Sequence, residues 1–136
     1  MAYSSRVLLA KPSPDCHDRG VRYVARKFRD AGFHVIFMNF LLPSEIANTA
    51  LDEDVQVIGV SSSSGGHMPL FEDLIALLKE QGLGDILLLG GGVIPNDDHE
   101  TLKQWGVKAI FGPGTTADDA IALIRQHMEN ISGPAA

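Results

Sequence analysis

The chain has 136 residues, of which 45% are hydrophobic and 21% charged, and its formal net charge at pH 7 is −6. This length predicts one domain with a sizeable core. The acidic balance argues against nucleic acid as a partner, because phosphate binding needs a basic surface. The single Cys excludes an internal disulfide and a Cys-rich zinc site. With no signal-peptide pattern and no apolar run of membrane-spanning length, we expect a cytoplasmic protein without a membrane partner.

Five apolar runs alternate with five helical patterns along the chain. The predicted strands are 7–10, 33–38, 55–60, 86–89 and 109–111, and the predicted helices begin near Val21, Pro43, Leu70, Asp97 and Thr115. This alternation predicts an α/β fold with a parallel sheet covered by helices on both faces. We expect the flavodoxin-like (Rossmann-like) strand order 2-1-3-4-5. The domain is expected to cover residues 1–131, followed by a frayed tail over 132–136.

The loop after the first predicted strand holds the residues best suited to chemistry. It runs from Lys11 to Gly20 and places Asp15 two residues before His17. A carboxylate can accept the proton on one imidazole nitrogen and leave the other nitrogen free to ligate a metal. The alternative is an ordinary loop, in which the Asp caps a helix and the His is solvated. The pair alone does not decide between these interpretations.

Small residues follow three further strands. They are the stretches Ser61–Gly66, Gly90–Gly92 and Gly112–Gly114. Small residues at the carboxyl end of a strand let a ligand approach the backbone closely, although each stretch could also be a plain flexible loop. The expected strand order brings these loops and the His loop to one end of the sheet, where open α/β proteins hold ligands.

Taken together, these stretches resemble the cobalamin-binding domain of the methylmalonyl-CoA mutase family. The likeness rests on four segments in the family's order, across nearly the whole chain: Asp15-Cys16-His17-Asp18-Arg19-Gly20, Ser61–His67, Gly91-Gly92-Val93-Ile94-Pro95, and Phe111-Gly112-Pro113-Gly114-Thr115. The resemblance extends to the separate small subunits of 2-hydroxyisobutyryl-CoA-type mutases. It implies adenosylcobalamin as the cofactor and radical rearrangement of an acyl-CoA as the reaction.

The resemblance also implies roles for particular residues. His17 is the expected lower axial ligand of cobalt, with Asp15 as its hydrogen-bonding partner and Lys11 extending the network. The cofactor's nucleotide tail is expected to lie against the other loops. The residues expected to contact the cofactor are Asp15, Cys16, His17, Asp18, Arg19, Gly20, Ser61, Ser63, Ser64, Gly65, Gly91, Gly92, Val93, Phe111, Gly112, Pro113, Gly114 and Thr115. His67 matches a family position near the tail, whereas His34, His99 and His127 are expected to be structural or solvated.

No catalytic residue is expected on this chain. A substrate-binding barrel needs about 250 residues, so we expect a separate large subunit to hold the acyl-CoA and the isolated chain to be inactive. The family usually has Gly at positions 13 and 16 and Leu at 63, where this chain has Ser13, Cys16 and Ser63. Asp-Cys-His also resembles the small subunit of glutamate mutase, which leaves an amino-acid mutase as an alternative. A corrinoid methyl carrier and a signalling receiver domain are further alternatives.

Overall fold

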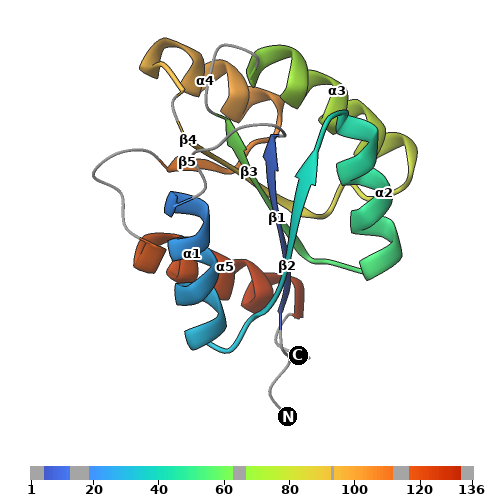
Figure 1. Ribbon diagram of the computed structural model, residues 1–136. Coiled ribbons are helices and arrows are strands. Elements are labelled where there is room, and N and C mark those ends of the chain that lie inside the picture. Colours follow the sequence, from blue (N-terminus) through green and yellow to red (C-terminus); the bar gives the residue numbers. More distant parts are fainter. Residues whose placement is uncertain (1–4, 13–18, 63–66, 93, 112–116, 133–136) are drawn as a thin grey trace.

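The computed structural model describes residues 5–12, 19–62, 67–92, 94–111 and 117–132. It shows a five-stranded parallel sheet in the order β2-β1-β3-β4-β5 (Figure 1), which confirms the predicted fold class. Helices and strands alternate throughout. In chain order they are β1 (Arg6–Pro12), α1 (Arg19–Asp30), β2 (His34–Phe40), α2 (Pro43–Glu53), β3 (Val57–Ser62), α3 (His67–Glu80), β4 (Leu87–Gly92), α4 (Asn96–Trp105), β5 (Ala109–Phe111) and α5 (Ala117–Ser132).

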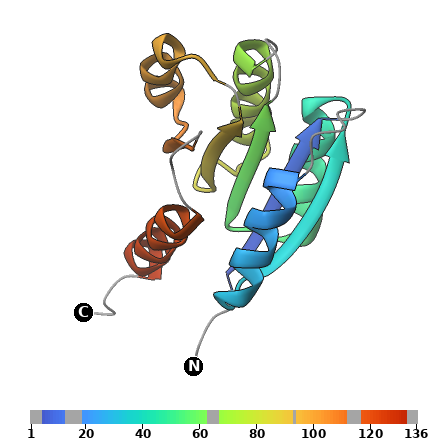
Figure 2. The same cartoon turned by 60° about the vertical axis from the view of Figure 1, so that its left-hand side comes forward.

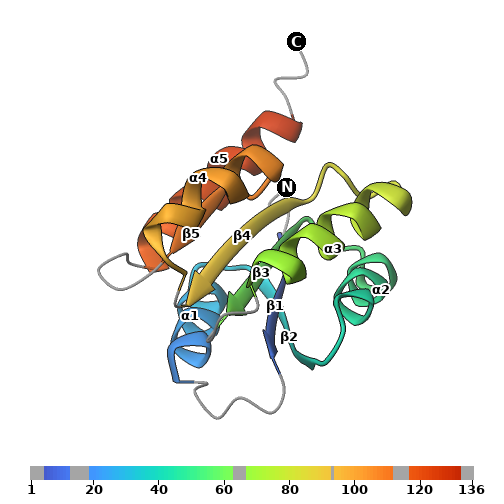
Figure 3. The same cartoon turned by 90° about the horizontal axis from the view of Figure 1, so that it is seen from above.

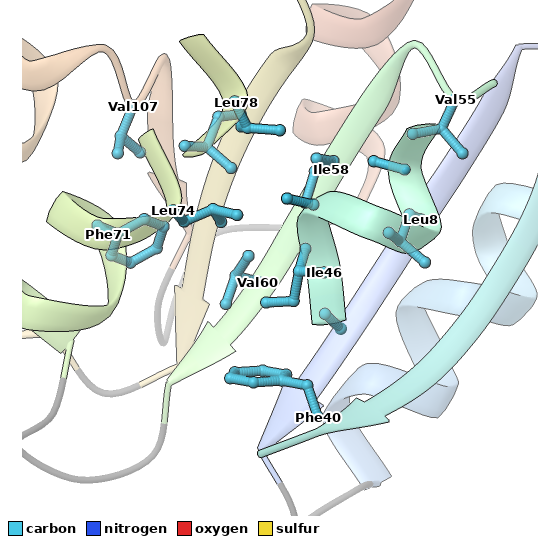
Figure 4. Close-up of a cluster of buried hydrophobic side chains, with 14 of the residues drawn as sticks. Leu8, Phe40, Ile46, Val55, Ile58, Val60, Phe71, Leu74, Leu78 and Val107 are labelled. Carbon is cyan, nitrogen blue, oxygen red and sulfur yellow. The ribbon is translucent and has the colours of Figure 1, made fainter. Parts of the chain in front are cut away.

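Two apolar cores lie on the two faces of the sheet. On one face, Leu8, Ile58 and Leu88 point toward α2, α3 and α4, and Phe71 and Leu74 of α3 are completely buried there (Figure 4). On the other face, the alternate strand residues pack with α1 and α5, which lie together on that side (Figure 2). The central strands are therefore apolar on both faces, as parallel strands covered by helices should be.

The strands extend beyond the apolar runs that predict them. The fourth strand was expected to end at Leu89, yet its ladder continues through Gly90, Gly91 and Gly92. Ladder hydrogen bonds use only the backbone, so glycine residues can continue a strand. Because glycine has no apolar side chain, the apolar pattern of the sequence does not predict this part of the strand. Helix α3 begins at His67, not at Leu70 as expected. Its Pro69 lies in the first turn, where a missing N–H costs little.

Local signals at the helix ends act as the sequence suggests. Gly32 follows α1 with a φ of 97°, the left-handed conformation that glycine adopts without strain. At the start of α2, the Glu45 carboxylate accepts a hydrogen bond from the backbone N–H of Leu42 at 3.0 Å. Among the described residues, none of the helices combines the length and the apolar character required to span a bilayer.

Candidate functional site

The carboxyl ends of the strands lie at one edge of the sheet (Figure 3). Across this edge Ser61 is paired with Gly91, Ser62 with Gly92, and Gly91 with Phe111. Three of the four segments that sequence analysis singled out therefore begin side by side on β3, β4 and β5. The fourth segment, residues 15–20, follows β1 in the chain, and β1 is hydrogen-bonded to β3. The parallel sheet thus gathers the predicted segments at the place where such folds bind ligands.

Only some of the predicted site residues fall within the described part of the chain. Ser61, Gly91, Gly92 and Phe111 are described in full, and Arg19 and Gly20 form the start of α1. Twelve lie outside the described residues, and their contacts stay predictions: Asp15, Cys16, His17, Asp18, Ser63, Ser64, Gly65, Val93, Gly112, Pro113, Gly114 and Thr115.

The described residues suit a ligand that approaches the backbone. A Cβ atom on Gly91 would lie 3.5 Å from the carbonyl oxygen of Phe111, an ordinary contact, so packing within the fold does not demand glycine at this position. Gly92 is the next residue of β4; it is exposed and has a φ of 91°. The two glycines pair with Ser61 and Ser62 of β3, so small residues lie on both of these strand ends. Small residues at the end of a strand let a ligand approach the backbone closely.

A buried lysine lies at the end of β1. Lys11 is only 4% exposed, although it belongs to the residue type that is almost never buried without partners. It is one residue beyond Ala10, whose partner on β3 is Val60, and so it lies near the level of Ser61. A charge removed from water needs polar partners. The predicted partners of Lys11, Asp15 and His17, lie outside the described residues, so the network stays a prediction.

Sequence analysis missed one polar contact at this edge. Nε2 of His67 lies 2.6 Å from Oδ2 of Asp98, and His67 is 5% exposed. The predicted strand order makes β3 and β4 neighbours, so the helices that follow them are expected to start near each other. Which side chains meet there is not contained in that prediction.

The other histidines of the described chain have different surroundings. His34 is exposed on β2, and His99 contacts the carbonyl oxygen of Ile94 through Nε2 at 3.0 Å. Burial lowers the pKa of His127, with a smaller contribution from Lys108. Within the described ranges, no three His, Cys, Asp or Glu side chains are grouped to hold a metal ion.

The fold and its carboxyl edge define a ligand-binding domain of the flavodoxin-like class. The family model of the B12-binding domain matches residues 5–122. The small subunit of 2-hydroxyisobutanoyl-CoA mutase from Aquincola tertiaricarbonis is 44% identical over 121 residues, which cover 88% of this chain and 89% of that subunit. The chain belongs to the B12-binding domain family, and its relatives are mutases.

Larger relatives contain the same domain as a minor part. Methylmalonyl-CoA mutase from Cereibacter sphaeroides is 49% identical over 126 residues, which cover 89% of this chain but 18% of that protein. The corresponding match in Escherichia coli is 43% identical over 127 residues and again covers 18% of the relative. The chain therefore spans less than a fifth of the length of these mutases.

Solved structures agree on the fold. A cobalamin-binding protein from Desulfitobacterium hafniense superposes with a TM-score of 0.72 at 24% identity, covering 91% of this chain and 59% of that one. A receiver domain of a Francisella response regulator gives a TM-score of 0.69 at 12% identity, covering 94% of this chain and 99% of that one. Both likenesses establish only the shared architecture, because one fold hosts many functions.

Proposed function

We propose that this chain is the cobalamin-binding small subunit of an adenosylcobalamin-dependent acyl-CoA mutase, and that a separate large subunit holds the substrate. The observation that carries the proposal is the pattern of coverage. The match covers 89% of the 2-hydroxyisobutanoyl-CoA mutase small subunit, while it covers only 18% of the methylmalonyl-CoA mutase from Cereibacter sphaeroides. A second polypeptide with a substrate-binding barrel would hold the acyl-CoA.

The residues of this chain would bind and orient the cofactor. His17 would ligate cobalt, and Asp15 would accept the proton on its other ring nitrogen and so fix the orientation of the imidazole. Lys11, buried at the end of β1, would extend that network. Ser61, Gly91 and Gly92 would lie against the nucleotide tail, where small side chains allow close approach. When bound, the cofactor would supply the radical chemistry of the rearrangement.

Electron paramagnetic resonance tests the cofactor half of the proposal. The purified chain is loaded with cobalamin, reduced to the cob(II)alamin state, and compared with the same sample made with ¹⁵N-histidine. We expect the spectrum to show coupling to one imidazole nitrogen and the coupling to change with the isotope. Coupling to the cofactor's own benzimidazole, unaffected by labelled histidine, would refute ligation by the protein.

A turnover assay tests the partner half. With adenosylcobalamin and a branched acyl-CoA, the purified chain alone should give no isomerised product, because substrate binding belongs to the large subunit. Activity should appear when the co-purified large chain is added. Turnover by the small chain alone would refute the two-subunit proposal, and omission of cobalamin from the reconstituted mixture is the matched control.

A further inference from the structure

A buried histidine joins the two helices that follow β3 and β4. His67 is the first residue of α3, and Asp98 lies in the first turn of α4. Nε2 of His67 and Oδ2 of Asp98 are 2.6 Å apart, although the residues are 31 positions apart in the sequence. His67 is 5% exposed, whereas the Asp98 side chain keeps 33% of its surface. One short contact thus connects the starts of two helices.

The chemistry of the pair determines which group donates the hydrogen bond. An ionised carboxylate only accepts hydrogen bonds, so Nε2 of His67 holds the hydrogen and donates it to Asp98. The first turn of α4 favours the negative charge of Asp98, because the unpaired N–H groups there carry a partial positive charge. Nδ1 of His67 is buried as well and has no hydrogen-bond partner within the described chain. Asp98 therefore determines how the imidazole is oriented.

Packing of the two helices does not require this polar contact. Phe71 and Leu74 of α3 and Leu102 of α4 belong to one buried apolar cluster, which already joins the helices. Replacing a buried polar pair by apolar side chains is often neutral or stabilising, because the pair must give up its hydration. Compared with apolar packing alone, the hydrogen-bonded pair fixes the separation and orientation of the starts of α3 and α4.

That separation matters at the carboxyl edge. Ser62 and Gly92 are partners at the ends of β3 and β4. Residues 63–66 connect Ser62 to His67, and residues 93–95 connect Gly92 to α4. The two segments that hold predicted cofactor contacts on β3 and β4 are therefore followed by the two helices that the pair joins.

We propose that His67 is a positioning residue for the cofactor, acting through Asp98. The pair holds the starts of α3 and α4 at one separation and thereby fixes the far ends of both connecting segments before the nucleotide tail binds. Affinity is higher when the elements that flank a ligand are held in place before it binds. This inference rests on the proposed binding of cobalamin.

Cobalamin titrations of the cofactor-free protein test the inference. His67→Phe keeps a flat ring and removes the donor, and Asp98→Ala removes the acceptor. We expect each to weaken cobalamin binding about 5- to 30-fold, which corresponds to about 1–2 kcal/mol. The double variant should bind cobalamin as tightly as the weaker-binding of the two single variants, since either change breaks the same contact. His67→Gln, whose amide nitrogen can replace Nε2 as the donor, should recover part of the affinity.

Asp97→Ala is the matched control, because Asp97 carries the same charge in the same turn of α4 and is exposed. It should stay within twofold of wild type. Urea unfolding of each cofactor-free variant separates stability from affinity. Lower stability with wild-type affinity would show that the pair is merely structural and would overturn the inference. If the fold-losses of cobalamin affinity in the two single variants multiply in the double variant, the two residues act independently. That result would also overturn the inference.

The design separates this inference from the proposed function. Wild-type protein is titrated first, and failure to bind cobalamin would overturn both. Tight binding by wild type and by Asp98→Ala would overturn only the role of the pair. If His67→Phe does not fold, Asp98→Ala decides the question, since Asp98 is partly exposed and its truncation leaves the apolar cluster intact.

Discussion

Gly91→Ala should separate cofactor binding from folding. Among the described residues, a Cβ atom at Gly91 would meet only the carbonyl oxygen of Phe111, at 3.5 Å, so the strand accommodates it. Replacing glycine where alanine fits stabilises a protein by about 0.4–1 kcal/mol through the unfolded chain. The same methyl group would occupy space that we propose for the cofactor's tail. Overpacking costs about 1–3 kcal/mol, which corresponds to roughly 5- to 150-fold weaker cobalamin binding.

Gly90→Ala, one residue earlier, is the matched contrast. Its Cβ atom would lie 3.1 Å from Cζ of the completely buried Phe71 and 3.5 Å from Cδ1 of Ile94. This variant should lose about 1–3 kcal/mol of unfolding free energy by overpacking.

Urea unfolding, followed by the fluorescence of Trp105, the single tryptophan, gives stability, and absorbance titration gives cobalamin affinity. Wild-type affinity in a folded Gly91→Ala protein would refute the claim that the tail approaches this backbone.

Three other changes probe the site, a helix start and the core. Asp15→Asn should weaken cobalamin binding about 10- to 100-fold, by loss of the proposed hydrogen-bonding partner of His17, with an unchanged melting temperature of the cofactor-free protein. Equal affinities in side-by-side titrations would mean that Asp15 only caps a loop. Hydrogen bonds from two backbone N–H groups lower the pKa of Glu45, so its charged form stabilises the fold above the unfolded pKa and this stability is lost as pH falls through the folded pKa. Glu45→Gln should therefore be less stable than wild type at pH 7, and the difference should shrink in urea unfolding toward pH 3; a constant difference would contradict this. Leu74→Ala, at a position with 0% exposure, should lose about 2–5 kcal/mol of unfolding free energy, whereas a loss below about 1 kcal/mol would mean that the core collapses around the cavity.

Much of the fold could be predicted from local patterns. Five short apolar runs separated by amphipathic helices permit few arrangements other than a parallel sheet with right-handed crossovers. The same patterns placed the Ser-Gly and Gly-Gly stretches after the third and fourth strands, and so at one edge. The register then confirmed that Ser61, Gly91 and Phe111 lie side by side.

The sequence by itself therefore determined the topology and the edge at which the site lies, because both follow from hydrophobic periodicity and chain order. Tertiary structure alone decided three features: the continuation of β4 through its glycines, the burial of Lys11, and the contact of His67 with Asp98. Each depends on what a distant segment presents at that position. Periodicity indicates only which face of an element is apolar. It does not indicate which strand pairs with the glycines, which side chains cover Lys11, or which carboxylate 31 residues away contacts His67.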